Sequence, residues 1–509
     1  MSNSFARLMT RAEESDYQET SRHADVMRFV EQLQQRGDPR LWVTRFGTSP
    51  ENRDLPLLVL SAHGVKTPEQ ARASELPVVL ILNGIHAGEV EGKEASLMLA
   101  RDLLSSSAGD LLEQMILLIV PLFNPDGNDR ISPTNRQLNI AKLEGQLGPP
   151  TGVGTRTNAA GINLNRDYMK QEAVEMQLLQ SNVCQVWQPH LTIDCHATNG
   201  SVHRFALTYD IPHTSESGRS EPILFMREQL LPLVTRRLQN RTGLDTFYYG
   251  NFVTDEGGSG SGWMTYPHNP RFGSNYRGLT NRLDLLLETY SYLSFPERVF
   301  TTYEFLVEVL NFVTERGRDM IQVVESSQRP PERVAVRYRL DSFAEPVEIL
   351  TREPRTLEGQ PISVTMPHLA RFVGTEVVDR PWAYAVPDAV ARHLRQHGLA
   401  VQQLAQDRNT AVEVAQVESA VGGQSRRILE ASSSGEKQFF AHYQQKTRKL
   451  VEGTYLVPTD QPLGAIAVYL CEASSDDGII TCGVIPEPVS GTEFPVLRVL
   501  EAVPVGVTK

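Results

Sequence analysis

Histidine and glutamate side chains stand where several predicted strands end, in a combination that suits metal-dependent hydrolysis. His86 and Glu89 follow the apolar run 78–82, His196 closes the segment HLTIDCH, and Glu288 closes the segment RLDLLLE. Apolar runs of this kind are typical of strands covered on both faces. Ligands bind in open α/β sheets where the carboxyl ends of strands meet helix N-termini, so we expect these side chains to converge. A His-x-x-Glu pair alone arises about once by chance in such a chain, and the prediction therefore rests on the convergence.

Two histidines and a glutamate are a ligand set for catalytic zinc, which keeps its fourth position open for water. Zinc lowers the pKa of that water and polarises a substrate carbonyl. Glu288 follows three leucines, and an apolar environment would raise its pKa into the range that suits a general base. Arginine side chains are suited to stabilising an oxyanion and to gripping a carboxylate with two parallel hydrogen bonds.

The elements that would position these residues alternate between strands and helices. Apolar runs of strand length lie at 42–46, 57–60, 78–82, 115–122, 190–196 and 282–288, and helical periodicity is found at 94–104, 220–240 and 296–316. This alternation predicts an α/β domain. A turn, NPDG, ends the strand at 115–122. The Gly- and Pro-rich stretch 144–162 reads as a long surface loop of the kind that often carries function.

The pattern changes after the segment SSQRPPE at 326–332, which reads as a linker. Short strand-like pieces follow, with one clear helix at 387–396; the pieces lie at 334–340, 347–350, 466–470 and 479–484. We therefore predict a catalytic domain at 1–325 and a β-rich α+β accessory domain at 333–509. Its length alone suggests that the accessory region covers the active-site cleft and restricts substrates.

Composition narrows the class of protein. The net charge of −12 is spread along the chain without a basic block, which argues against a nucleic-acid partner and against binding to anionic membranes. No apolar run approaches membrane-spanning length, and the N-terminus lacks the apolar core of a signal peptide, so we expect a cytoplasmic protein. The four cysteines lack Cys-x-x-Cys spacing and are expected to be reduced and buried, Cys195 included.

The chain resembles the zinc carboxypeptidase (M14) family of metallopeptidases over about residues 17–320. The matching motifs, in family order, are HAGE at 86–89, NPDG at 124–127, NLNRD at 163–167, the HA pair at 196–197 and LLLETYSY at 285–292. The resemblance implies a mixed, twisted eight-stranded sheet flanked by helices. It also implies one Zn²⁺ held by His86, Glu89 and His196, with Glu288 as general base.

The same resemblance assigns the substrate contacts. It implies that Asn165 and Arg166 clamp the C-terminal carboxylate of a peptide, and that Arg156 in the segment GTRTN stabilises the oxyanion. Arg130 and Arg136 also lie between the NPDG turn and the clamp, so the oxyanion assignment stays open among the three arginines.

The chain departs from the family pattern in three places. Asn163 stands where an aspartate often orients a zinc histidine, which leaves that partner neutral. The tyrosine that closes over the substrate has no direct match, since Phe252 and Val253 occupy its place; Tyr276 is the expected replacement and Tyr266 the alternative. The segment of the specificity pocket at 260–262 is Gly-Ser-Gly and offers no acidic residue, so it gives no support for a lysine or arginine preference.

These features predict a hydrolase of the metallopeptidase class, in which zinc-bound water and a glutamate base cleave the C-terminal peptide bond. One alternative is a zinc amidohydrolase or deacylase that acts on acyl-amino acids or cell-wall peptides. Another is a catalytically silent protein that keeps the site for zinc or peptide binding, an interpretation favoured by Asn163 and the missing tyrosine.

Overall fold

A mixed eight-stranded sheet forms the centre of the first 326 residues in the computed structural model, which describes residues 8–105, 111–198, 200–253, 262–421 and 437–506. Its spatial order is β1 (Leu41–Thr48), β2 (Asp54–Leu60), β4 (Ile116–Val120), β3 (Val78–Asn83), β5 (Leu191–Thr198), β10 (Leu283–Tyr290), β6 (Leu207–Asp210) and β7 (Thr246–Tyr248). The four central strands, β4, β3, β5 and β10, are parallel, whereas β1, β2 and β6 each pair with a neighbour in antiparallel fashion. This arrangement confirms the predicted sheet.

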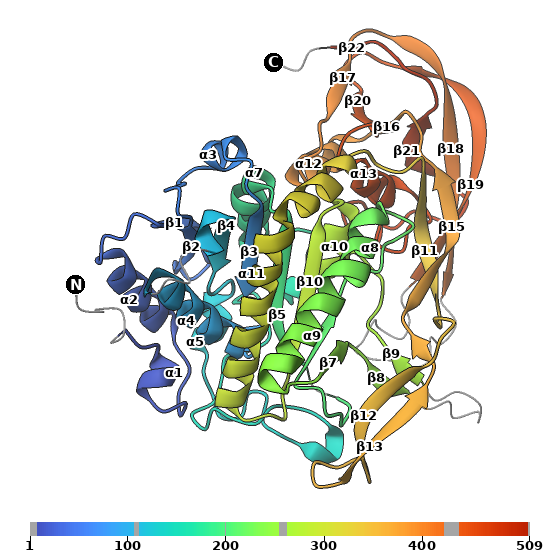
Figure 1. The fold of residues 1–509 in the computed structure, drawn as a ribbon. Helices are drawn as coiled ribbons and strands as arrows, with labels where there is room; N and C mark the ends of the chain where they lie inside the picture. Colours follow the sequence, from blue (N-terminus) through green and yellow to red (C-terminus); the bar gives the residue numbers. More distant parts are fainter. Residues whose placement is uncertain (1–7, 106–110, 199, 254–261, 422–436, 507–509) are drawn as a thin grey trace.

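Helices cover one face of the sheet. Figure 1 shows α11 and α9 lying across it, beside α4. The helices whose buried side chains share a core with this face are α2 (His23–Gln34), α4 (Glu91–Ser105), α8 (Glu221–Phe225), α9 (Leu231–Thr242) and α11 (Phe295–Ser326). The last helix runs ten residues beyond its predicted end, with a non-helical residue at Arg316. Among the described residues, no helix is both long enough and apolar enough to span a membrane.

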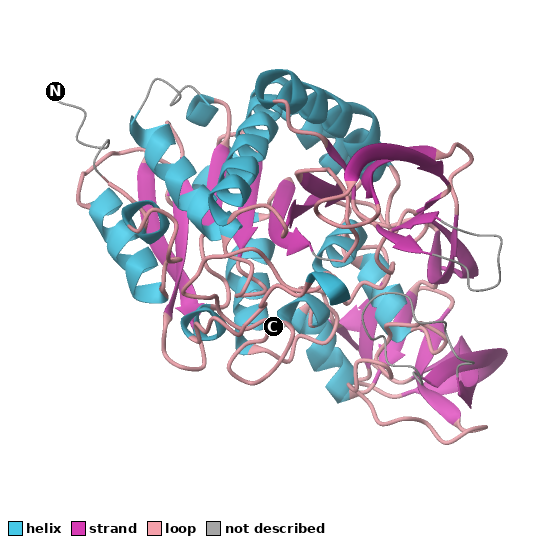
Figure 2. Cartoon of the chain, turned by 90° about the horizontal axis from the view of Figure 1, so that it is seen from below, coloured by secondary structure: helices cyan, strands magenta, loops and turns pink. Residues whose placement is uncertain are grey.

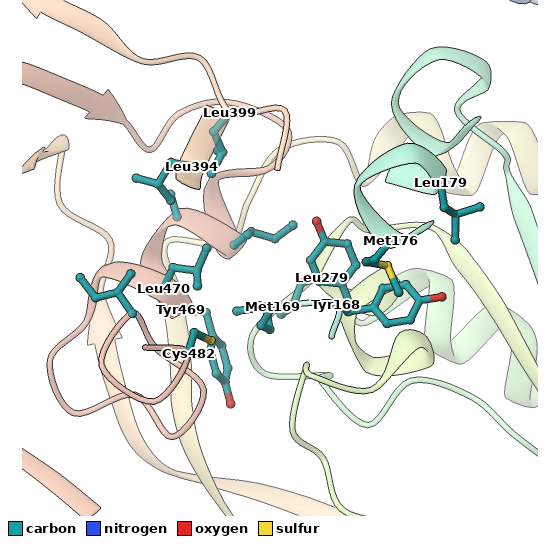
Figure 3. Close-up of a cluster of buried hydrophobic side chains, with 14 of the residues drawn as sticks. Tyr168, Met169, Met176, Leu179, Leu279, Leu394, Leu399, Tyr469, Leu470 and Cys482 are labelled. Atoms are coloured by element: carbon teal, nitrogen blue, oxygen red, sulfur yellow. The ribbon is translucent and has the colours of Figure 1, made fainter. Parts of the chain in front are cut away.

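The opposite face of the sheet packs on shorter helices and on the C-terminal region. The shorter elements with side chains in the core of this face are α3 (Pro68–Ala73), η4 (Leu164–Arg166), α6 (Val174–Leu179), η5 (Gln180–Cys184), α7 (Gln185–Trp187) and α10 (Gly273–Leu279). Two further short elements, α1 (Arg11–Glu14) and η6 (Met226–Leu230), join the core under the long helices. The remaining short helices are α5 (Pro125–Asp129) and η3 (Ile140–Lys142). One hydrophobic core joins β3 and β4 to α6 and α10 and continues into residues 334–496. Figure 3 shows this junction, where Met169 faces Tyr469 and Cys482 of the C-terminal region and Tyr168 lies beside Met176.

The C-terminal region is built mainly from strands that pair in antiparallel fashion. Strands also predominate on the right-hand side of the molecule in Figure 2, where Figure 1 places this region. Its largest sheet has the order β19 (Lys437–Leu450), β18 (Arg408–Val421), β21 (Glu493–Val499), β16 (Ala383–Val386), β20 (Tyr455–Pro458), β17 (Gln402–Leu404) and β22 (Val505–Gly506). The other strands are β11 (Arg333–Asp341), β12 (Val347–Glu353), β13 (Gln360–Met366), β14 (His368–Leu369) and β15 (Arg371–Asp379). Parallel pairing of β14 with β9 (Gly262–Met264), which in turn pairs with β8 (Asn251–Val253), links the two regions. The division into two domains stays a prediction.

Two of the strand predictions in the C-terminal region are wrong. Residues 466–470 belong to α13 (Gly464–Cys471), and 479–484 form turns. The helix α13 is buried on every side, so its sequence is apolar throughout and shows no helical periodicity. The predicted helix at 387–396 is confirmed as α12 (Asp388–Gln396).

Along the neighbouring strands β5 and β10, successive side chains alternate between the helix-covered core and the face that carries the candidate site. Ile193 and Cys195 point into the helix-covered core, where Cys195 is buried as expected. The next residue, His196, therefore points to the other face. Glu288 lies opposite His196 in the parallel register, so both reach the same side of the sheet.

Candidate active site

Three donor atoms from separate parts of the chain face one another at the carboxyl ends of β3 and β5. His86 Nδ1 lies 3.2 Å from His196 Nδ1, and the Glu89 carboxylate is 3.1 Å from His86 Nδ1 and 3.0 Å from His196 Nδ1. All three residues are buried. Donors bound at zinc–nitrogen distances in tetrahedral geometry are roughly 3.3 Å apart, so this set fits a zinc ion.

The other imidazole nitrogens face oxygen atoms, which leaves the two Nδ1 atoms turned toward the shared site. Asn163 Oδ1 accepts from the Asn165 backbone N–H and lies 3.0 Å from His86 Nε2, so Nε2 carries the proton. Asp194 Oδ1 lies 3.0 Å from His196 Nε2 as an ion-pair contact. The two Nδ1 atoms lie 3.2 Å apart beside the Glu89 carboxylate, as donors to one shared cation would. The donor chemistry therefore suits a metal ion.

Asp194 is a partner that the motifs did not predict. It lies two residues before His196 on the same face of β5 and is itself bound by Arg277 at 2.6 Å. Burial would raise the pKa of Asp194, but the charges of His196 and Arg277 outweigh burial and lower it to about 2. Arg277 also contacts Asp284 and donates to the Tyr168 hydroxyl at 2.7 Å. His196 is thus held in a fully buried charged network.

Replacing Asp194 with asparagine is expected to weaken zinc binding by about 10- to 100-fold, because the charged partner that fixes and polarises the His196 ring is lost. Competition with a chromophoric chelator measures this affinity. Asp284→Asn is the matched control, since Asp284 contacts the same Arg277. Equal zinc affinities for wild type and Asp194→Asn would contradict the assigned role.

Glu288 lines the same cavity as His86 and Glu89 and sits beside His196 in the register of β5 and β10. Burial raises the pKa of the Glu288 carboxyl to about 8, and the nearby Glu89 carboxylate adds to this, against the charges of His196 and the arginines. A carboxyl with a raised pKa binds a proton more strongly, as a general base near neutral pH requires.

Asn165 and Arg166 lie in the short helix η4 on the wall of this cavity. Asn165 Oδ1 accepts from the Gly273 backbone N–H at 2.9 Å, and the Arg166 guanidinium donates to the Asn165 carbonyl at 2.8 Å. The guanidinium also lies 3.7 Å from the ring centre of Phe272. Backbone and aromatic contacts therefore hold the arginine in place while it faces the cavity.

The cavity has a volume of about 440 Å³ and is lined by His86, Glu89, Glu288, Asn165 and Arg166 together. Its other lining residues include Arg136, Lys142, Glu144, Arg156, Thr198, Tyr249, Phe252, Tyr266, Phe272, Ser274 and Leu286. No lining residue in the described part of the chain comes from 333–506, so the expected cover by the C-terminal region is not seen in the cavity wall.

Residues 26–189 match the family model described as zinc carboxypeptidase, Peptidase_M14. This segment of the chain therefore resembles the zinc carboxypeptidase family. Carboxypeptidase 2 of Trichophyton tonsurans is 23% identical over 471 residues, which cover 89% of this chain and 81% of the fungal protein. Carboxypeptidase 2 of Trichophyton equinum is 22% identical over 470 residues, with coverages of 88% and 81%.

Solved structures show a weaker similarity to this chain. A putative carboxypeptidase A from Shewanella denitrificans is 16% identical with a TM-score of 0.41, covering 58% of this chain and 69% of that one. A metallo-carboxypeptidase from Pseudomonas aeruginosa, in complex with (2-guanidinoethylmercapto)succinic acid, is 19% identical with a TM-score of 0.40 and the same coverages.

Two arginines of the site approach Glu89, one of the three candidate metal donors. Arg136 Nη1 lies 3.0 Å and Arg156 Nη1 3.4 Å from Glu89 Oε1. Arg136 also donates to Gln146 at 2.7 Å and to the Ala197 carbonyl at 3.2 Å, and its side chain is 13% exposed against 34% for Arg156. The third candidate, Arg130, pairs with Glu51 and does not line the cavity. Arg156 is therefore the more accessible of the two cations at the site.

The expectation that Tyr276 contacts substrate is corrected by the structure. Tyr276 is 2% exposed, does not line the cavity, and places its hydroxyl 2.8 Å from Nδ1 of His397 in the C-terminal region. Ser274 of the same helix does line the cavity, and two residues along a helix turn the side chain by about 200°. Tyr266, the sequence alternative, lines the cavity together with Tyr249.

The predicted segment of the specificity pocket cannot be placed as a whole, because Gly260 and Ser261 lie outside the described residues. Gly262 begins β9 and pairs with Val253. A side chain at Gly262 would meet Leu369 of the C-terminal region, so this position belongs to the packing between the two regions.

Proposed function

We propose that this chain is a zinc-dependent carboxypeptidase that hydrolyses the C-terminal peptide bond of a peptide. The observation that carries the proposal is one cavity lined by two members of a metal donor set, by a carboxyl with a raised pKa and by an oriented arginine, with the third donor, His196, next to Glu89 behind its wall. A free carboxylate suits the planar guanidinium of Arg166, and this recognition would limit cleavage to the end of a chain.

His86, Glu89 and His196 would hold the zinc ion, which supplies a Lewis acid and an acidified water when bound. Glu288 takes a proton from water and returns it to the nitrogen of the leaving amino acid. The Arg156 guanidinium stabilises the negative charge that develops on the substrate carbonyl oxygen. Asn165 and Arg166 hold the terminal carboxylate, which fixes the scissile bond relative to Glu288.

Hydrolysis of peptides that differ only at the C-terminus tests this proposal. We expect release of the last residue from peptides with a free carboxylate, little release from the amidated peptides, and loss of activity with a zinc chelator. N-acyl amino acids also carry a terminal carboxylate and fit a cavity of this volume, so they belong in the panel. Cleavage of acyl-amino acids without cleavage of longer peptides would favour the deacylase alternative, and no cleavage at all would overturn the proposed function.

Arg156→Met is expected to lower kcat by about 100- to 1000-fold, because a donor to the developing oxyanion is removed. Arg136→Met is the matched variant, since Arg136 reaches the same Glu89 oxygen but is held by Gln146 and the Ala197 carbonyl. Its kcat is expected to fall by less than about tenfold. Steady-state kinetics at matched zinc content compares the two, and the reverse order of effects would give the oxyanion role to Arg136.

A further inference from the structure

The loop between Thr265 and Gly273 forms a thin wall behind the proposed carboxylate clamp. On one side it faces the active-site cavity, and on the other a second cavity of about 220 Å³. Arg166, Pro267 and Phe272 line both cavities. Because empty space backs this wall, packing alone restrains it less than it would in a close-packed interior.

Polar contacts from the C-terminal region hold the outer side of this loop. Asp477 Oδ2 accepts from the Arg271 backbone N–H at 2.8 Å, and its Oδ1 accepts from Arg271 Nε at 2.6 Å and pairs with Nη2 at 2.5 Å. One position earlier, Asp476 Oδ2 lies 2.7 Å from His268 Nε2. A buried carboxylate thus fixes both the backbone and the side chain of the residue that precedes Phe272.

The turn that carries these carboxylates is itself firmly anchored. Glu472, at its start, receives the Arg498 guanidinium, with Nε at 2.8 Å, and the Tyr384 hydroxyl at 2.5 Å. Tyr469 donates to Asp476 at 2.6 Å, and Asp477 is 1% exposed. A charge held this rigidly can position a loop that would otherwise move.

Residues of the loop's own domain restrain its ends. Asn275 Nδ2 donates to the Pro267 carbonyl at 2.9 Å, and Asn165 Oδ1 accepts from the Gly273 N–H. Between these points the loop carries Phe272, whose ring supports the Arg166 guanidinium at 3.7 Å. A chain of contacts therefore leads from Asp477 through Arg271 and Phe272 to the clamp arginine.

We propose that Asp477, assisted by Asp476, is a positioning residue for substrate recognition, through which the C-terminal region sets the geometry of the carboxylate clamp. This inference rests on the proposed carboxypeptidase function. Asp477 touches neither substrate nor metal donors, so its loss should weaken binding of the free carboxylate in the ground state and the transition state alike. Such uniform loss raises KM and leaves kcat nearly unchanged.

Asp477→Asn tests this role in the full-length, zinc-loaded protein. We expect KM for a peptide with a free C-terminus to rise about tenfold and kcat to change less than about twofold, with zinc content unchanged. The preference for free over amidated peptides should fall by the same factor. Glu493→Gln is the matched control, because Glu493 pairs with Lys446 and Arg448 in the same region but lies on the surface, and it should leave KM as in wild type.

Arg271→Met removes the ion pair with Asp477 by changing its other partner, and it should reproduce the rise in KM. If Asp477→Asn does not fold, the KM of Arg271→Met tests the positioning role instead. Unchanged KM in a folded variant, or a fall in kcat without a rise in KM, would overturn the positioning role.

Calorimetric binding of 3-phenylpropanoate, a simple carboxylate, separates this inference from the proposed function. Wild type that binds the carboxylate without cleaving peptides would overturn the proposed function. The positioning role of Asp477 would still be tested, because Asp477→Asn should bind the carboxylate about tenfold more weakly, a loss of about 1.4 kcal/mol in binding free energy. Wild type that binds no carboxylate would overturn both.

Discussion

Glu288→Gln is expected to lower kcat by about a thousandfold, because the amide cannot take a proton from water or return it to the leaving nitrogen. The variant should still bind zinc, since Glu288 is outside the donor set of His86, Glu89 and His196. Steady-state hydrolysis of a peptide with a free C-terminus, with zinc content measured on the same sample, checks both expectations.

Glu144→Gln provides the control for this variant. Glu144 also lines the cavity, so its replacement removes a carboxylate from the site without touching the strand that carries Glu288. Activity close to wild type is expected. Full activity in Glu288→Gln would exclude Glu288 as the base, and a wild type with no activity to lose would favour the silent binding-protein interpretation.

Arg166→Gln is expected to lower kcat/KM for peptides with a free C-terminus by roughly 100- to 1000-fold. Truncating one partner of a buried, hydrogen-bonded charge pair costs about 2 to 5 kcal/mol, and about 1.4 kcal/mol corresponds to a factor of ten. Amidated peptides lack the carboxylate, so their slow hydrolysis should change little. The ratio of kcat/KM for the two peptides is the decisive measurement.

Lys142→Gln is the matched control, because Lys142 is another cation on the cavity wall. It should keep the preference for a free carboxylate. If Arg166→Gln kept that preference and Lys142→Gln lost it, the clamp would have to be reassigned to the loop that carries Lys142.

The central strands were predictable from the sequence because each is buried on both faces and therefore continuously apolar. β3, β4, β5 and β10 all lie within the predicted runs or extend them by a few residues. The donor set followed from motifs placed at the ends of these strands. The rule that a continuously apolar run is a buried strand gave a wrong prediction for α13. This helix is buried on all sides, so its sequence lacks the periodicity that distinguishes a helix from a strand.

Residues that act through distant contacts could not be predicted in this way. Tyr276 was misassigned because its environment is created by His397, 121 positions further along the chain. Asp194 orients His196 only because β5 places both side chains on one face, a signal that the strand pattern contained but the motif did not. Asp477 reaches Arg271 across more than 200 residues, and nothing local in either sequence marks the pair.

The metal content of the purified protein tests the central claim most directly. We predict one zinc ion per chain in wild type without added metal, loss of that zinc in His196→Ala, and loss of peptidase activity when a chelator removes it. A wild-type protein that binds no zinc, or a His196→Ala variant that keeps it, would contradict the assignment of His86, Glu89 and His196 as the metal site.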